Sequence, residues 1–172
     1  MTMSSASAFS LRAPEDWPAK GFGLRAEAEA DGRFLLDLFI SVRAPDFAAT
    51  GWPPEMLAAF LSNQFQFQSR HYANAYPDPA RYVVTHQGEP VGRLFLDAGP
   101  EVIRVVDVAL LPQFRGGGLG ASLLRAVQAA GGGAAITLSV NVGSAAHRLY
   151  QRLGFAEVAG NEAAWEMRWT PA

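Results

Sequence analysis

A run of glycines has the clearest chemical meaning in this sequence. Four glycines occupy the five positions from Gly116 to Gly120, directly after an apolar stretch and before a segment with helical spacing. Because glycine has no Cβ, successive backbone N–H groups can point at one external position, which suits an anion. The start of a helix adds partial positive charge, and Arg115 supplies donors matched to phosphate oxygens. One or two glycines would be enough for a tight turn alone. We therefore expect residues 115–120, the glycine-rich loop, to bind a pyrophosphate.

The kind of phosphate ligand follows from what surrounds the loop. The P-loop pattern GxxxxGK[ST] is absent, and no lysine follows Lys20. Gly116, Gly118 and Ala121 match the loose dinucleotide pattern G-x-G-x-x-A, but the next strand ends in residues 139–142 without the carboxylate that would bind a ribose. A predicted antiparallel hairpin before the loop also conflicts with a βαβ unit. A dinucleotide-binding domain stays an alternative, for which NAD should protect the protein against heat.

Two motifs resemble those of the GNAT superfamily of acyl-CoA-dependent N-acyltransferases. Its first signature, [Q/R]-x-x-G-x-[G/A], is met by Arg115, Gly118 and Gly120. Its second, an alanine-containing helix that ends in L-Y-x-x-x-G-F, is met by Ala146, Leu149, Tyr150, Gly154 and Phe155. The resemblance covers about residues 22–169. It implies acetyl-CoA as the cosubstrate, no metal, and a sheet whose fourth and fifth strands splay apart to admit the pantetheine arm.

The resemblance also implies which residues contact CoA. Backbone amides around Val108 to Leu110 would point at the thioester carbonyl. The family often carries an asparagine six or seven residues before the tyrosine, but here Gly143 and Ser144 hold those places and Asn141 lies nine positions before Tyr150. The expected CoA-binding residues are Val108, Ala109, Leu110, Arg115, Gly116, Gly117, Gly118, Leu119, Gly120, Asn141, Ser144 and His147.

Acetyl transfer to an amine needs a neutral amine, a stabilised oxyanion and a proton for the departing thiolate. By resemblance Tyr150 lies near the sulfur, and a phenol with an ordinary pKa near 10 can protonate a thiolate. The alternative role of Tyr150 is packing on Phe155. His147, three residues earlier, could act as a base, although a helical histidine beside Arg148 is usually a surface residue.

Asp107 interrupts an otherwise aliphatic stretch, and burying an unpaired carboxylate would cost several kcal/mol. It therefore needs a partner or a function. One interpretation makes Asp107 the general base. In the other, a hairpin that turns at residues 98–102 places Arg93 opposite Asp107, and the two form a structural ion pair.

The length and composition of the chain restrict the fold and function that it can have. Its 172 residues suit one domain, predicted as 22–172 after a partly ordered N-terminal extension at 1–21. A formal net charge of −2 gives no attraction to nucleic acid or membranes. We expect a cytoplasmic protein, since no long apolar span or secretory signal is visible. The lack of cysteine excludes a disulfide framework and a cysteine nucleophile.

Hydrophobic spacing predicts an α/β fold with a mixed, mostly antiparallel sheet flanked by four helices. The predicted strands are 22–27, 81–86, 90–97, 102–111, 135–140, 155–158 and 164–169. Four helices are predicted. The first is 31–43, and the second opens after residues 53–54 and includes 57–72. The third and fourth are 121–130 and 145–153. Residues 64–68 also fit strand alternation, but the lack of a turn before them favours helix.

Together these observations predict an N-acetyltransferase that moves an acetyl group directly from acetyl-CoA to a primary amine in a ternary complex. No acyl-enzyme thioester can form without cysteine. The alternative is a non-catalytic acyl-CoA-binding domain of the same fold. The acceptor would be a small-molecule or peptide amine, in a pocket lined by Phe34 to Val42, Leu57 to Tyr72 and the last hairpin. The protein would be a monomer or a homodimer.

Overall fold

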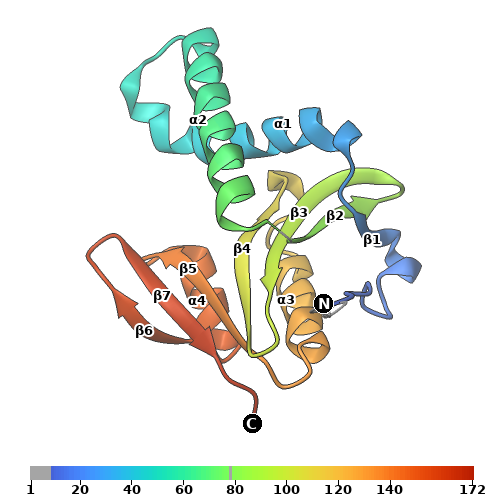
Figure 1. The fold of residues 1–172 in the computed structure, drawn as a ribbon. Helices are drawn as coiled ribbons and strands as arrows, with labels where there is room; N and C mark the ends of the chain where they lie inside the picture. The colour runs from blue at the N-terminus through green and yellow to red at the C-terminus, as the bar shows by residue number, and fades with distance from the viewer. Residues whose placement is uncertain (1–8, 78) are drawn as a thin grey trace, which may run out of the picture.

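The computed structural model describes residues 9–77 and 79–172 of the chain. Its centre is a sheet of seven strands in the order β1-β2-β3-β4-β5-β7-β6, in which β4 and β5 are parallel and all other neighbours are antiparallel (Figure 1). The strands are β1 (Phe22–Ala26), β2 (Ala80–His86), β3 (Glu89–Ala98), β4 (Val102–Leu110), β5 (Ala135–Asn141), β6 (Ala156–Gly160) and β7 (Ala164–Trp169). The predicted mixed α/β fold is confirmed.

The four α-helices also occur in the predicted order. They are α1 (Gly32–Arg43), α2 (Pro54–Ala75), α3 (Leu119–Ala130) and α4 (Ala145–Arg152). Residues 64–68 lie within α2, as expected. Helix α3 begins two residues earlier than predicted, because Gly118 takes the left-handed conformation at its N-cap and the helix can start at once.

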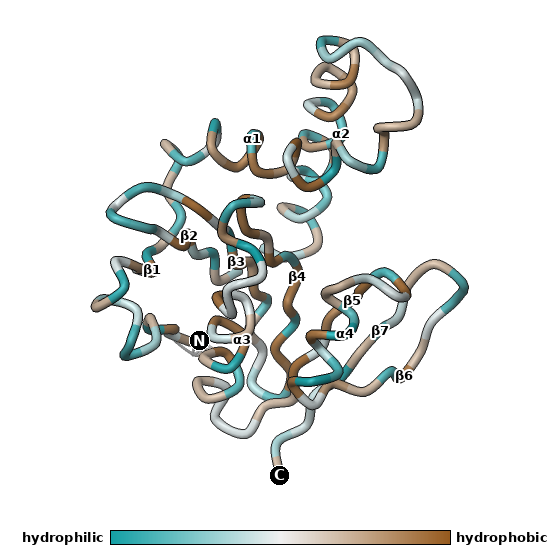
Figure 2. Tube along the Cα trace, turned by 180° about the vertical axis from the view of Figure 1, so that it is seen from behind, coloured by the Kyte–Doolittle hydropathy of each residue, from teal (hydrophilic) through white to brown (hydrophobic). Residues whose placement is uncertain are grey.

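The core packs α3 and part of α4 against the sheet. Val84, Leu94, Leu123 and Ile136 are fully buried within it, and Figure 2 shows hydrophobic residues along β4. Burial of such side chains from water is the main contribution to the stability of the fold.

Packing begins before the predicted boundary at Phe22. Leu11 and Trp17 are buried in the core, and Trp17 Nε1 donates a hydrogen bond to Ser122 Oγ of α3 at 3.0 Å. The first eight residues of the predicted extension lie outside the described residues. Periodicity missed this segment because the few apolar residues of this irregular stretch have no period.

Strands β4 and β5 pair only at their beginnings. Their register runs from Val102 with Ala135 to Val105 with Leu138. Beyond that point β4 continues to Leu110 and β5 to Asn141 without pairing to each other, so the predicted splay is confirmed (Figure 1).

The predicted register of the β3–β4 hairpin is wrong. Phe95 is the residue opposite Asp107, and Arg93 lies opposite Ala109. The hairpin closes with Ala98 opposite residue 103, and an irregularity between Phe95 and Leu96 adds one more residue on β4. Arg93 therefore reaches Asp107 diagonally rather than directly across the strands.

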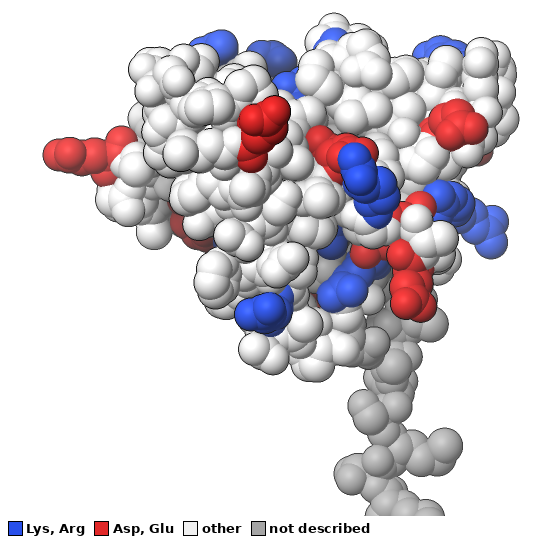
Figure 3. Space-filling view, turned by 90° about the horizontal axis from the view of Figure 1, so that it is seen from above, with Lys and Arg blue, Asp and Glu red and all other residues white. Residues whose placement is uncertain are grey.

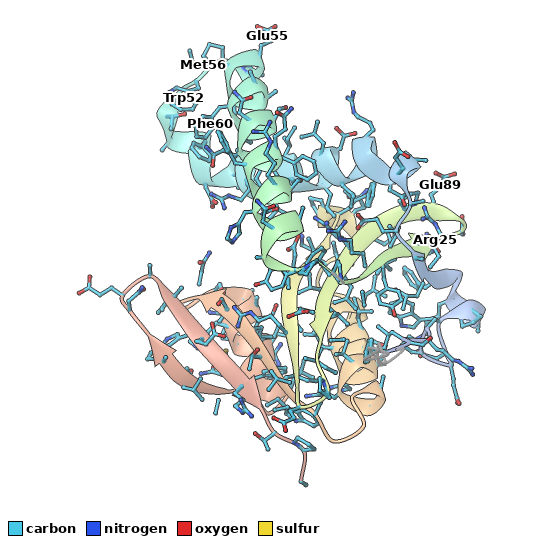
Figure 4. The ribbon with its side chains drawn as sticks, viewed as in Figure 1. Arg25, Trp52, Glu55, Met56, Phe60 and Glu89 are labelled. Atoms are coloured by element: carbon cyan, nitrogen blue, oxygen red, sulfur yellow. The ribbon has the colours of Figure 1, made fainter. Side chains whose placement is uncertain are left out.

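Helices α1 and α2 and the 3-10 segment between them, Ala44–Thr50, form a helical arm that projects above the sheet (Figure 1). Asp31, which is buried, binds the Arg25 guanidinium through both carboxylate oxygens at 2.7 and 2.8 Å and so ties β1 to the start of the arm. Figure 4 shows Trp52 and Phe60 at the far end of the arm, where their rings pack at 5.4 Å.

Candidate active site

Two cavities meet where β4 and β5 diverge. The loop cavity, about 620 Å³, lies between the glycine-rich loop, α3 and α4. The arm cavity, about 630 Å³, lies beneath the helical arm and above β4 and β5. The residues that line both are Val42, Val108, Ala109, Ala146 and Tyr150. A molecule in one cavity can therefore meet a molecule in the other at these residues.

The glycine-rich loop presents backbone donors to the loop cavity. Gly116 and Gly118 have φ angles of 79° and 84°, which side chains with a Cβ rarely adopt. The first intrahelical bond of α3 runs from Ser122 N–H to the Gly118 carbonyl, so the N–H groups of residues 119–121 precede it. The loop thus combines a backbone concavity with the positive end of a helix.

The six loop residues do not all face the same cavity. Gly116, Gly118, Gly120 and Arg115 line the loop cavity. Gly117 instead lines a smaller cavity beside the N-terminal segment. Leu119 is buried in the core, so only its backbone is available to a ligand.

Arginines surround the loop cavity. Arg115 Nε donates to the Leu110 carbonyl at 2.9 Å, which holds this side chain at the end of β4. Arg125 of α3 and Arg152 of α4 also line the cavity. Arg148 donates to the Gly143 carbonyl at 3.0 Å and is not among the lining residues. The sequence alone did not assign these arginines individually, although Arg125 lies on the helix after the first motif and Arg152 lies within the second.

The free edge of β4 supplies further donors. The Leu111 N–H donates to the Val91 carbonyl on the β3 side. Because alternate residues of a strand direct their N–H groups to opposite sides, those of Val108 and Leu110 face the opening towards β5. Val108, Ala109 and Leu110 all line the loop cavity.

Tyr150 lies at the junction of the two cavities. Its ring packs on Phe155 with centroids 5.8 Å apart, so the packing role is present. Its side chain is nevertheless among the lining residues of both cavities. Burial, with a smaller effect of Asp107, raises the pKa of Tyr150 to about 12. The phenol therefore stays protonated at neutral pH and is available as a proton donor.

Asp107 lines the arm cavity beside Tyr72 and Arg93. Arg93 Nη1 lies 3.7 Å from Asp107 Oδ2, so the predicted ion pair forms despite the changed register. Burial raises the pKa of Asp107, whereas Arg93 and the Val108 N–H lower it. Both interpretations of Asp107 therefore have a structural basis: it is paired, and it faces a cavity as a carboxylate with increased proton affinity.

Asn141 and Ser144 lie in the arm cavity rather than beside the glycine-rich loop. Ser144 caps α4: its hydroxyl accepts from the His147 N–H at 3.1 Å and donates to the Asn141 carbonyl at 2.8 Å. This arrangement fixes the end of β5 relative to the start of α4.

The structure separates His147 from the predicted site. Its ring is buried and lines neither large cavity. Nδ1 accepts from the Gly143 N–H at 3.1 Å, and Nε2 lies 2.8 Å from Glu157 Oε1. His147 is thus neither the surface residue nor the base that the sequence suggested. The helical turn points it at β6, an orientation that spacing from Tyr150 alone does not reveal.

The helical arm forms the outer wall of the arm cavity, as predicted. Leu35, Leu38 and Phe39 of α1 and Phe65, Gln68 and Tyr72 of α2 line it, together with Ala164 of the last hairpin. Seen from above, acidic and basic side chains are interspersed over this end of the molecule (Figure 3). No helix in the described part of the chain is long and apolar enough to cross a bilayer.

Solved structures of other proteins share this architecture. The PaiA N-acetyltransferase of Thermoplasma acidophilum, solved with coenzyme A, superposes with a TM-score of 0.68 at 13% identity, covering 87% of this chain and 99% of that one. A protein solved as histone acetyltransferase HPA2 and related acetyltransferase, from Corynebacterium glutamicum, gives 0.64 at 23% identity over 88% and 97% of the two chains. These likenesses concern the fold.

A third structure, a GCN5-related N-acetyltransferase from Rhodopseudomonas palustris, gives a TM-score of 0.62 at 20% identity over 94% of this chain and 98% of that one. No curated protein sequence matches significantly. A family model described as an acetyltransferase (GNAT) domain matches residues 78–157, which contain β3, β4, the glycine-rich loop and Tyr150. Residues 78–157 are thus similar to a GNAT acetyltransferase domain, in agreement with the resemblance of the two sequence motifs.

Proposed function

We propose that this protein transfers an acetyl group from acetyl-CoA directly to a primary amine. The observation that carries the proposal is the junction of the two cavities at Val108, Ala109 and Tyr150. A thioester that enters from the loop cavity and an amine that enters from the arm cavity would meet there. Direct attack in a ternary complex brings the reactants together without a covalent enzyme intermediate.

The loop cavity fits coenzyme A in shape and charge. The concavity at Gly116 and Gly118, with the N-terminal N–H groups of α3, suits the pyrophosphate. Arg125 and Arg152 line the same cavity and would pair with the remaining phosphate of CoA. The apolar side chains of Leu124, Leu149 and Leu153 offer contacts to the pantetheine and adenine groups.

The residues at the junction and directly beside it have distinct roles in this proposal. The N–H groups of β4 that face the opening, from Val108 and Leu110, would stabilise the oxyanion that develops on the thioester carbonyl. Asp107 would accept a proton from the attacking amine, and Tyr150 would donate a proton to the departing sulfur. The amine thus loses a proton to Asp107 on one side of the reacting carbonyl, and the sulfur gains a proton from Tyr150 on the other.

Thiol release tests the proposed activity directly. Acetyl-CoA is incubated with the protein and with amino acids, peptides, polyamines, aminoglycosides or small amines in turn. We expect free CoA thiol and an N-acetylated product, identified by mass, for at least one of these classes. Tight CoA binding without thiol release for any class would instead support the non-catalytic binding domain.

A substitution in the glycine-rich loop tests the CoA site separately. Gly118→Val should weaken CoA binding by about tenfold or more, because the added side chain disfavours the left-handed backbone and obstructs close approach to the pyrophosphate. Isothermal calorimetry with CoA measures this loss.

Gly133→Val is the matched control for that measurement. Gly133 also has a left-handed φ, of 96°, and no atom lies within 4 Å of the position that a Cβ would take there, but it follows the opposite end of α3. It should lower stability to a similar extent and leave CoA affinity unchanged. Equal CoA affinities in the parent and Gly118→Val proteins would exclude the loop as the pyrophosphate site.

A further inference from the structure

Asp107 belongs to a cluster of charged side chains at the inner end of the arm cavity. The cluster comprises Glu27, directly after β1, Arg81 of β2, Arg93 of β3 and Asp107 of β4. Both guanidinium groups lie over the Phe95 ring, at 4.7 Å for Arg81 and 5.1 Å for Arg93. Phe95 is the register partner of both Arg81 and Asp107, so this row of side chains crosses the sheet on one face.

Arg93 is shared between the two carboxylates. Its Nε lies 3.4 Å from Glu27 Oε2, and its Nη1 lies 3.7 Å from Asp107 Oδ2. The Arg93 and Glu27 side chains are only 9% and 12% exposed, whereas Asp107 is 31% exposed. Asp107 lines the arm cavity, but Glu27 does not line either large cavity. Glu27 therefore contacts Arg93 from the side away from the substrate.

This geometry divides one positive charge between two negative ones. If Arg93 faced Asp107 alone, its full attraction would favour the ionised carboxylate and make Asp107 a weaker base. A second carboxylate at the opposite end of the guanidinium offsets that attraction and also prevents a buried cation from being left unpaired.

We infer that Glu27 is a positioning residue, which holds Arg93 and balances its charge so that Asp107 retains the proton affinity of a general base. This inference rests on the proposed function of Asp107. Glu27 itself touches neither the acetyl donor nor the amine.

The other groups near Asp107 are consistent with this role. Burial and Glu27 raise the pKa of Asp107, and Arg93 and the Val108 N–H lower it. Tyr72 of α2 and Tyr76, directly after α2, face the cluster, where their rings pack on Phe95, and Tyr150 faces it from α4. The pKa of Tyr72 is raised to about 12, mainly by burial and then by Asp107. The phenols of Tyr72 and Tyr150 are therefore neutral at neutral pH. Of the three charged residues that share the cluster with Asp107, Arg93 and Glu27 act on its pKa, whereas Arg81 lies on β2, on the far side of Phe95 in the strand pairing. Arg104 lies farther along β4, paired with Glu166.

The kinetic test compares Glu27→Gln with the parent. At low pH kcat/KM should decrease as Asp107 becomes protonated, and this decrease is the acid limb of the pH profile. Losing the Glu27 charge should move the acid limb to lower pH. The kcat/KM measured at a pH below the limb, divided by the kcat/KM on the plateau above it, should therefore rise by about threefold. Glu29→Gln removes the same charge from an exposed position two residues away and should leave the limb in place. A role of Glu27 in stability alone would lower the melting temperature without moving the limb.

An activity-independent measurement separates this inference from the proposed function. Carboxyl-carbon NMR of the full chain, with Asp107→Asn to assign the signal, follows the titration of Asp107. Its midpoint should fall in Glu27→Gln and fall by less in Glu27→Asp, which keeps the charge but withdraws it. The second variant also serves if Glu27→Gln does not fold.

The outcomes are distinct. A midpoint that does not fall in either folded variant overturns the inference and leaves the proposed function standing. A midpoint that falls while the kinetic limb stays in place supports the link from Glu27 to Asp107 and contradicts the role of Asp107 as base.

Discussion

Tyr150→Phe should lower kcat by about 10²- to 10⁴-fold, the usual effect of losing a positioned general acid. The substitution removes one hydroxyl at the junction of the cavities and keeps the ring that packs on Phe155 at 5.8 Å. The fold and the affinity for CoA should survive, so the loss should appear in kcat rather than in KM for acetyl-CoA. Steady-state kinetics with the amine identified by thiol release measures it.

The leaving group provides an internal check on this role. An acyl donor with a more acidic thiol needs less proton transfer, so it should be less sensitive to Tyr150→Phe. Tyr76→Phe is the matched control, because Tyr76 loses the same hydroxyl on a residue that lines neither large cavity. If chemistry limits the rate and Tyr150→Phe stays within about twofold of the parent, a smaller loss than general-acid removal predicts, the thiolate leaves without this proton.

Local patterns in the sequence were sufficient for much of this fold and for part of the site. The period of apolar residues located most of the seven strands and four helices because these elements bury one face, although all residues of β6 are exposed. The glycine-rich loop was recognisable because its backbone conformation restricts residue type at positions such as Gly116 and Gly118.

The features that sequence reasoning missed depend on contacts between distant segments. Glu27 follows β1 and Arg93 lies on β3, with β2 between these strands, so no spacing relates the two residues. The irregularity between Phe95 and Leu96 changed the partner of Asp107, and nothing in a run of aliphatic residues marks where such an irregularity falls. His147 was misplaced for a similar reason, because its orientation depends on Gly143 and on Glu157 across the following turn.

Asp107→Asn should lower kcat/KM by about 10²- to 10⁴-fold and remove the acid limb of its pH profile, because asparagine cannot accept the proton of the amine. Stability should change little. Burial raises the pKa of Asp107 in the folded state, so the stability linked to this group is present below its unfolded pKa and is lost as pH rises through the folded pKa. At neutral pH the ionised carboxylate is therefore a net cost to folding.

The expected change in stability distinguishes the two roles of Asp107, as general base and as structural partner of Arg93. Arg93 keeps Glu27 at 3.4 Å when Asp107 is neutralised, so no buried cation is left unpaired. We expect the free energy of unfolding at neutral pH to stay within about 1 kcal/mol of the parent or to rise, because Arg93 keeps one carboxylate partner and the cost of burying the Asp107 carboxylate is removed. Asp37→Asn, at an exposed ion pair with Arg33 on α1, is the control for loss of a carboxylate outside the cavities. A large fall in melting temperature with kcat/KM preserved would make Asp107 a structural partner of Arg93, whereas loss of activity in a protein of unchanged stability would identify it as the base.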